Sequence, residues 1–320
     1  MSLAFDGFPD PVRLTQAAAI AAARYRGRGD EQAADRAAIA AMQDEANRLA
    51  VRGIVAIGEG EAGASEVLYS GEHLGAAGGP AVDFGLDPLD GATLCARNQP
   101  NALAVAVIAG RGALLALPET YMEKIAVGPG YPAGTVALEL SPAENIARLS
   151  KAKGVSPAEI GVCILDRPRH GRLIEAVRAA GARIRLIGDG DIAGVLFALD
   201  PTRTGVDLYL GVGGAREGAL AAAALRCVGG AMEGRLVLDS AEKRANAARL
   251  GFADPHRLFT AEDMTAGELR FAASAVTDSP LLAGVIFGEG RISVSSIAVD
   301  SGAKTLRRTT AELADTAQTA

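Results

Sequence analysis

The sequence predicts an α/β fold with an N-terminal α+β part and a C-terminal part built on a parallel type of sheet. Short alternating apolar runs, typical of strands, end in turns of Gly, Pro and acidic residues. Beyond about residue 154 strands and helices alternate, which favours βαβ units. Apolar residues make up 49% of the 320 residues, which supports a large core. We expect two subdomains, residues 1–137 and 138–320.

Helix starts and strand runs define the elements of the first half. Asp10 and Pro11 form an N-cap followed by a proline in the first turn, and Asp30 caps a second, Ala-rich helix. Glycines break the chain between these elements. The expected order is a helix over 10–25, a helix from 30 to near 53, a strand after Gly53, a helix over 65–74, a strand over 81–86, and a hairpin of 102–109 with 113–117. Layered helices over a mainly antiparallel sheet follow from this order.

The second half repeats a strand followed by a helix. Each strand is an apolar run of about five residues, and polar turns separate it from the next helix. Ligands of such sheets bind at the carboxyl ends of the strands. The expected strands are 161–165, 183–187, 206–210, 270–276, 284–287 and 292–299, and the expected helices are 170–180, 192–199 and 215–227. The small polar stretch 309–320 is expected to fray.

Composition excludes several classes of function. The net charge of −6 argues against nucleic acid or an anionic membrane as a partner. The three cysteines lie far apart and form no metal-binding spacing, which indicates a reducing compartment. No apolar run approaches the roughly 20 residues of a membrane span, and the first residues show no signal-peptide pattern. We therefore expect a cytoplasmic protein.

Asp87 and Asp90 are the strongest chemical signal in the chain. They flank Pro88 and Leu89 after a predicted strand, and Gly91 follows. The proline and glycine turn the chain, so both carboxylates should stand at the carboxyl end of the strand. Two carboxylates that stand close together repel each other unless a proton or a cation lies between them. Mg²⁺ and Mn²⁺ prefer oxygen ligands, so either ion could fill this position. The alternative is an Asp-Pro turn with solvated charges.

Further acidic residues occupy similar positions. Glu59 and Glu61 follow an apolar run in a glycine-rich loop, and Glu217 follows the Gly211–Gly214 turn. Asp35 falls in the early part of the second helix. Each acid taken alone reads as a solvated charge, whereas together they indicate a divalent-metal site.

These segments, in this order, resemble the class II fructose-1,6-bisphosphatase family, some of whose members also hydrolyse sedoheptulose 1,7-bisphosphate. The resemblance runs through almost the whole chain. Its most family-specific motifs are Tyr-Met-Glu-Lys at 121–124 and Val-Gly-Pro-Gly at 127–130. It implies the layered α-β-α-β-α sandwich of the lithium-sensitive sugar phosphatases. It also implies carbohydrate metabolism of the gluconeogenic type, a Mn²⁺- or Mg²⁺-dependent enzyme, and a homodimer or homotetramer.

The resemblance assigns metal ligands and catalytic residues. Asp35 and Glu59 would hold one metal ion, and Asp87, Asp90 and Glu217 another. The Leu89 carbonyl would assist by analogy with the wider superfamily. The catalytic set it implies is Asp87, Asp90, Glu59 and Thr93.

It also assigns a substrate site spread over several loops. Arg167 and Arg169 offer the planar donors that suit phosphate, with a solvated strand end as the alternative. Asp189 and Asp191 would accept hydrogen bonds from sugar hydroxyls, with an ordinary turn and helix N-cap as the alternative. The full set is Asp90, Gly91, Ala92, Tyr121, Arg167, Pro168, Arg169, Asp189, Gly190, Asp191 and Gly214.

Two departures from the family pattern leave two hypotheses open. Ala92 stands where the family has a threonine that orients the attacking water, and Glu31 stands where it commonly has lysine. Thr93 is a candidate substitute for that threonine. The first hypothesis is a metal-dependent phosphatase that removes the 1-phosphate of fructose 1,6-bisphosphate, slowly if the hydroxyl is needed. The second is a sugar-phosphate-binding regulatory or sensor protein with little turnover.

Overall fold

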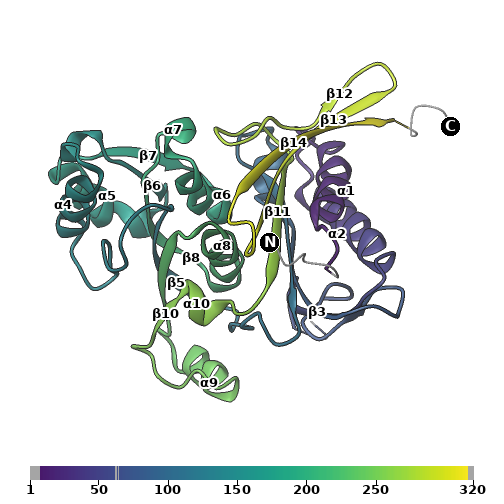
Figure 1. Cartoon of the computed structure of the whole chain (residues 1–320), viewed down its shortest axis with the longest axis horizontal. Helices are drawn as coiled ribbons and strands as arrows, with labels where there is room; N and C mark the ends of the chain where they lie inside the picture. Colours follow the sequence, from purple (N-terminus) through teal and green to yellow (C-terminus); the bar gives the residue numbers. More distant parts are fainter. Residues whose placement is uncertain (1–7, 62, 64, 316–320) are drawn as a thin grey trace. The chain divides into compact units, whose positions relative to one another are not determined.

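A computed structural model describes residues 8–61, 63 and 65–315. The chain divides into two compact units (Figure 1): unit 1 runs to Leu114 and resumes at Ala266, and unit 2 is Leu115–Thr265. This division differs from the expected boundary at 137/138. The late strands return to the first sheet through hydrogen bonds that a reading along the chain does not reveal.

Unit 1 is built on a mostly antiparallel sheet of eight strands. The strand order is β12-β13-β11-β4-β3-β1-β2, with β14 paired to β13. Among the described residues of this unit, the one parallel pair is β1 with β3. Its strands are β1 (Arg52–Ile57), β2 (His73–Leu74), β3 (Ala81–Asp90), β4 (Leu103–Gly110), β11 (Leu269–Ala275), β12 (Ile286–Phe287), β13 (Arg291–Asp300) and β14 (Leu306–Ala314). The expected antiparallel character of this part is confirmed.

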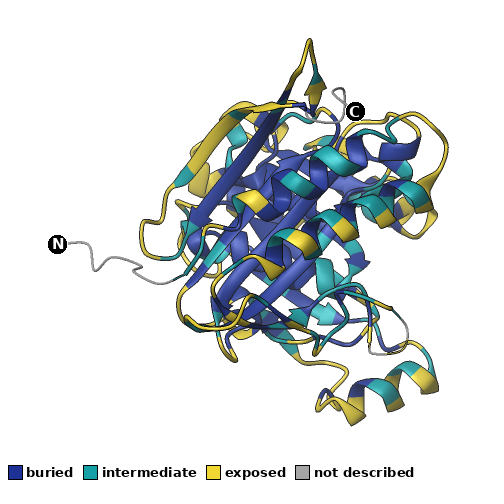
Figure 2. Cartoon of the chain, turned by 90° about the vertical axis from the view of Figure 1, so that its right-hand side faces the viewer, coloured by how far each residue is buried: buried dark blue, intermediate teal, exposed yellow. Residues whose placement is uncertain are grey.

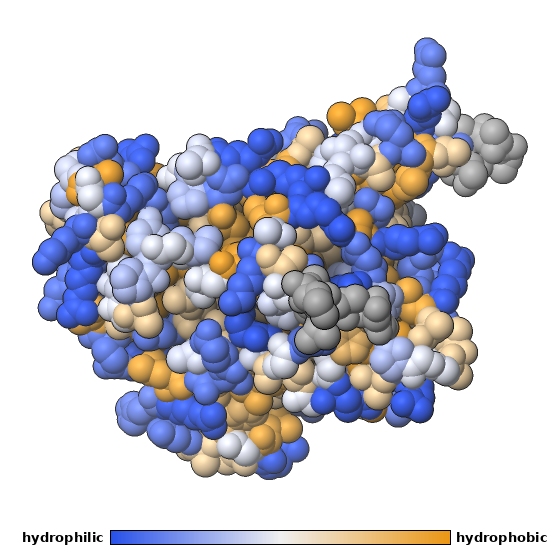
Figure 3. Space-filling view, viewed as in Figure 1, coloured by the Kyte–Doolittle hydropathy of each residue, from blue (hydrophilic) through white to orange (hydrophobic). Residues whose placement is uncertain are grey.

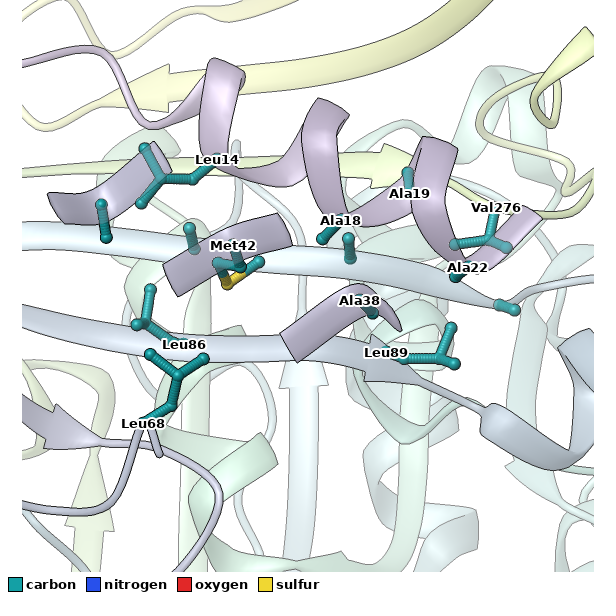
Figure 4. Packing of buried hydrophobic residues seen from close by; sticks show 14 of the residues in the cluster. Leu14, Ala18, Ala19, Ala22, Ala38, Met42, Leu68, Leu86, Leu89 and Val276 are labelled. Carbon is teal, nitrogen blue, oxygen red and sulfur yellow. The ribbon is translucent and has the colours of Figure 1, made fainter. Parts of the chain in front are cut away.

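Two helices cover one face of this sheet. In Figure 2, α1 (Val12–Ala23) and α2 (Glu31–Asn47) lie across strands coloured as buried. Alanines face inward, so the helices pack closely against the strands (Figure 4); Ala18 and Ala22 meet residues such as Leu89 and Val276 in one cluster. The Asp30 side chain accepts from the backbone N–H of Ala33 over 2.9 Å, so the expected cap is present. A short helix, α3 (Ala92–Ala96), follows β3.

Three expectations for unit 1 are wrong. The stretch 65–74, expected to be a helix, is a loop that ends in β2 and hydrogen-bonds to β1, since the Gly71 N–H donates to the Val55 carbonyl and the Val55 N–H to the Glu72 carbonyl. The hairpin partner expected at 113–117 forms no strand, because β4 pairs with β3 and β11 instead. The stretch expected to fray forms β14 as far as Ala314, paired along β13; residues 316–320 lie outside the described residues.

Unit 2 has a six-stranded sheet of mixed direction. The order is β10-β9-β5-β8-β6-β7, and β6 pairs in parallel with β7 and β8 as expected. Its strands are β5 (Tyr121–Val127), β6 (Gly161–Leu165), β7 (Arg183–Ile187), β8 (Leu208–Gly214), β9 (Ala231–Leu236) and β10 (Leu258–Thr260). The strands β5, β9 and β10 run antiparallel and were not expected from the sequence.

Unit 2 also contains helices and 3-10 turns, some beside the parallel strands and others beside the antiparallel strands. They are α4 (Pro142–Lys153), α5 (Gly171–Ala179), α6 (Asp191–Leu196), α7 (Pro201–Thr204), α8 (Ala215–Val228), α9 (Ala241–Arg249) and α10 (Ala261–Met264), with 3-10 turns η1 (Pro157–Glu159), η2 (Pro168–His170) and η3 (Phe197–Leu199). Two mixed sheets with packed helices confirm the α/β class.

The molecular surface shown in Figure 3 is mainly hydrophilic, with hydrophobic residues in small separate patches. In the described part of the chain, no helix has both the length and the apolar character that crossing a membrane requires.

Candidate active site

In unit 1, two acidic loops leave the same edge of the sheet. Strands β1 and β3 are parallel, with Ile57 opposite Gly85, so their carboxyl ends lie together. Glu59 follows β1 by two residues, and Asp87 lies near the end of β3. Glu59 therefore follows a strand end as predicted, whereas β3 continues through Pro88, so Asp87 lies inside the strand and Asp90 is its last residue.

The Asp87–Asp90 turn interrupts the regular pairing of β3 with β4. Asp87 lies opposite Val105 and Asp90 opposite Leu103, so four residues of β3 face three of β4. The Asp87 Oδ1 accepts from the Leu89 N–H over 3.2 Å, which holds the turn. Asp90 is buried, with 8% of its surface exposed. This bulge re-aims the two carboxylates at the end of the strand, as bulges beside functional sites commonly do.

Gly91 ends the turn in a conformation that favours glycine. Its φ of 90° lies in the left-handed region, so a side chain there would be strained. Ala92 and Thr93 then begin α3 and are partly exposed. Ala92 packs against the hydrophobic cluster under α2, which a methyl group can do and which needs no hydroxyl.

Asp35 lies on α2, which packs against both α3 and β3. Burial raises the pKa of its carboxyl group, and the neighbouring Arg36 offsets part of that rise. A partly buried carboxylate of this kind is stabilised in its charged form by a nearby cation. The predicted partner, Glu59, is also partly buried.

The donor chemistry fits a hard divalent cation, although no ligand set is preassembled among the described residues. There, no group of three or more His, Cys, Asp or Glu side chains is arranged to hold a metal ion. The acids of unit 1 supply carboxylate oxygens only, and these are the ligands that Mg²⁺ and Mn²⁺ prefer. Since Glu217 belongs to unit 2, the five-acid ligand set stays a prediction.

In unit 2, the predicted phosphate-binding arginines leave the carboxyl end of β6. Arg167 pairs with Asp189, the Nη2–Oδ1 distance being 3.1 Å. Arg169 donates from Nε and Nη2 to the Val212 carbonyl at 3.1 and 2.7 Å, and its guanidinium lies 4.9 Å from the centre of the Tyr121 ring. These contacts hold the Arg169 fork in place on β8.

His170 hydrogen-bonds to the backbone of both β6 and β8. Its Nδ1 lies 2.7 Å from the Leu165 carbonyl, so this nitrogen carries the proton and donates. Its Nε2 accepts from the Val212 N–H at 2.8 Å. Burial is the main cause that lowers the pKa of His170, so the ring is neutral and acts as a structural link between β6 and β8.

Asp191 makes hydrogen bonds that neither interpretation of the sequence, a sugar-binding carboxylate or a helix N-cap, had predicted. It begins α6 after Gly190, whose φ of 85° is left-handed, yet it makes no N-cap bond. One carboxylate oxygen accepts from Lys124 Nζ and the other from the Tyr209 hydroxyl. Burial and the Asp191 charge raise the pKa of Tyr209 well above its usual value, so the phenol stays protonated and donates.

A pocket of about 280 Å³ lies where β8 passes into α8. It is lined by Tyr121, Gly214 and Glu217, which the sequence predicted, and by Lys243 of α9, which it did not. A Cβ on Gly214 would come within 1.7 Å of a Glu217 carboxylate oxygen, so only glycine lets this carboxylate lie against the strand. Lys243 Nζ lies 5.9 Å from the centre of the Tyr121 ring.

The predicted site residues fall into two groups, one in each unit. Unit 1 holds Asp35, Glu59, Asp87, Asp90, Gly91, Ala92 and Thr93, and unit 2 holds Tyr121, Arg167, Pro168, Arg169, Asp189, Gly190, Asp191, Gly214 and Glu217. Sequence reasoning missed Lys124, Tyr209 and Lys243 as site residues. The sequence signal for Lys124 was its place in the Tyr-Met-Glu-Lys motif, directly before the apolar run 125–127.

Comparison with known proteins identifies the family. Residues 8–313 match the family described as bacterial fructose-1,6-bisphosphatase, glpX-encoded, and the chain belongs to this family of phosphoric monoester hydrolases. A protein of Parasynechococcus marenigrum (strain WH8102), named D-fructose 1,6-bisphosphatase class 2/sedoheptulose 1,7-bisphosphatase, is 38% identical over 322 residues, covering 96% of each chain. A protein of the same name from Synechococcus elongatus is 37% identical over 321 residues, covering 92% of each. The resemblance inferred from the motifs is confirmed.

Proposed function

We propose that this protein removes the 1-phosphate of fructose 1,6-bisphosphate, and that of sedoheptulose 1,7-bisphosphate, by attack of water. The observation that carries the proposal is the similarity to relatives named for both activities over 92% or more of the chain. All five acids expected of the family are present, and four of them lie on or beside the β1–β3–α3 part of unit 1.

Two sets of acidic side chains would bind the metal ions. Asp35 and Glu59 would hold one Mn²⁺ or Mg²⁺ ion, and Asp87, Asp90 and Glu217 a second. When bound, such ions neutralise phosphoryl oxygens and lower the pKa of water.

The loops of unit 2 would hold the substrate itself. Arg167 and Arg169 bind the phosphate that is retained, through planar donors. Asp189 and Asp191 accept hydrogen bonds from sugar hydroxyls. Gly214, which has no side chain, lets the ligand approach the backbone closely.

Phosphate release tests the proposal directly. The purified protein, treated with a chelator and then supplied with Mn²⁺ or Mg²⁺, should release phosphate from both bisphosphates and little from fructose 6-phosphate. Asp87→Asn should lower kcat about 100-fold or more, while Asp300→Asn, at the end of β13 in unit 1, should leave it unchanged. Equal activity with and without metal would reject the metal-dependent reaction.

Ala92 and Glu31 support a second candidate, a sugar-phosphate-binding regulatory protein with little turnover. Both departures fall in segments that the family uses for catalysis or phosphate binding. Calorimetry separates the candidates: micromolar binding of fructose 1,6-bisphosphate without phosphate release from any sugar phosphate would favour the regulatory protein.

The proposal includes a cytoplasmic homodimer or homotetramer, as the family resemblance implies. Sedimentation equilibrium of the purified protein would give its mass directly, and a monomer at micromolar concentration would contradict this part. Fractionation of the source cells would test the location.

A further inference from the structure

A lysine with a fully buried side chain lies beneath two predicted substrate contacts in unit 2. The Lys124 side chain has an exposed fraction of 0%, and its Nζ reaches the Asp191 carboxylate and, at 2.6 Å, the Gly214 carbonyl. Burying an ammonium group is costly unless it is paired and hydrogen-bonded. These two acceptors meet that requirement and join α6 to the end of β8.

Neighbouring residues leave room for this arrangement. A Cβ on Gly218 of α8 would lie 3.2 Å from Lys124 Cδ, and one on Gly213 of β8 would lie 2.2 Å from Asp191 Oδ2. The lysine stem and the carboxylate therefore occupy spaces that other residue types would fill. The Tyr209 hydroxyl holds the second carboxylate oxygen, so both oxygens of Asp191 are fixed in place by protein donors.

We infer that Lys124 is a positioning residue for the sugar part of the substrate, an inference that rests on the proposed function. Each Asp191 oxygen accepts one protein donor and keeps further lone-pair capacity for a substrate hydroxyl. The Lys124 ammonium group orients the Asp191 carboxylate, and with it the lone pairs that remain for a substrate hydroxyl. It also fixes the Gly214 backbone at the pocket. Arg167 and Arg169 are held by Asp189 and Val212 instead, so the phosphate contacts do not depend on Lys124.

Two substitutions separate this role from general stability. Lys124→Met keeps the stem but removes the charge, leaving Asp191 and the Gly214 carbonyl without their donor. Tyr209→Phe removes a single hydroxyl and is the milder variant if Lys124→Met does not fold. Lys153→Met is the matched control, because Lys153 also pairs with an aspartate in unit 2, Asp207, over 2.6 Å.

The expected result is a selective loss of sugar binding. KM for fructose 1,6-bisphosphate should rise about tenfold in Lys124→Met and about threefold in Tyr209→Phe, with kcat changed less than KM. The inhibition constant of inorganic phosphate should stay within twofold in both variants. Lys153→Met should change neither constant.

Two outcomes would overturn the inference. In folded variants, an unchanged KM would show that Asp191 needs no positioning, and a parallel rise in KM and in the phosphate constant would show a merely structural role. If the wild-type protein releases no phosphate, the proposed function fails, and the same comparison is made by calorimetry with fructose 1,6-bisphosphate and inorganic phosphate. Selective weakening of the sugar ligand would then still support the role of Lys124.

Discussion

The backbone N–H of Val212 donates a hydrogen bond to Nε2 of His170 over 2.8 Å, and the carbonyl of the same Val212 accepts both donors of Arg169. One residue of β8 therefore ties a neutral imidazole and a guanidinium to the strand. Changes at His170 and Arg169 should have separable effects, one on stability and the other on substrate binding.

Arg169→Ala should raise KM for the bisphosphate more than it lowers kcat. The retained phosphate is held equally in the ground and transition states, so its loss weakens binding in both. We expect a rise of about tenfold or more, since a charge-assisted bidentate contact is lost. Arg169→Lys keeps the charge but not the planar pair of donors, so its KM should lie between those of the wild type and Arg169→Ala. Steady-state kinetics check this, and an unchanged KM in Arg169→Ala would remove Arg169 from the phosphate site.

Stability should depend on pH through His170. Its pKa is lowered in the folded protein, so below about pH 6.5 the unfolded chain binds a proton that the folded chain does not. Stability is therefore fully present above that pH and is lost as the pH falls toward the lowered folded value. Thermal unfolding of wild type and His170→Asn between pH 7.5 and 5.5 tests this: the variant should show the shallower decline in Tm. Identical slopes would mean that His170 titrates alike in both states.

Ala92→Thr should raise kcat by roughly tenfold, about 1.4 kcal/mol in barrier, if a hydroxyl at this place orients the attacking water. Ala92 starts α3 directly after the Asp87–Asp90 turn and is partly exposed. Thr93→Ala is the companion variant. A silent Ala92→Thr together with an inactive Thr93→Ala would show that Thr93 already fills the role.

Asp83→Asn should destabilise unit 1 without a direct effect on the site. The buried Asp83 Oδ2 accepts from the N–H groups of Gly112 and Ala113 at 2.7 and 3.1 Å, and Arg111 Nε lies 3.1 Å from Oδ1. We expect a loss of about 1–3 kcal/mol in the free energy of unfolding, because charged acceptors of buried N–H groups are replaced by an amide. Asp300→Asn, whose carboxylate accepts from exposed turn N–H groups, should cost less. Urea unfolding gives both values, and equal losses would contradict the role assigned to burial.

The parts of the fold that were predicted from sequence are those with a strong local signal. The strands 161–165 and 183–187 were expected with the bounds that β6 and β7 have. The first is a short apolar run and the second alternates arginine with β-branched or aliphatic residues, and polar turns bound both. The polar strand β14 gave no such signal, since its order comes from nine residues of pairing with β13. The pairing of β4 with β11, which lies more than 150 residues further along, is set by tertiary contacts, and local propensity does not encode it.

The same limit applies to the site. The loop arginines and the acids stand in recognisable motifs, so their roles could be proposed from the resemblance of those motifs to the family. Lys124 reads as a solvent-facing lysine until Asp191, 67 positions further along, is known to lie beside it. The double role of Val212 is likewise a property of backbone groups, to which its side chain gives no clue.

The return of the C-terminal strands to unit 1 has a consequence for biosynthesis. Unit 2 is continuous in sequence, so it can fold as soon as its last helix has left the ribosome. Strand β4 must wait with one edge open until β11 emerges more than 150 residues later, because β11 pairs with it along seven residues. During that interval the nascent chain carries an apolar edge strand, the feature that makes unfinished proteins prone to aggregation and dependent on chaperones.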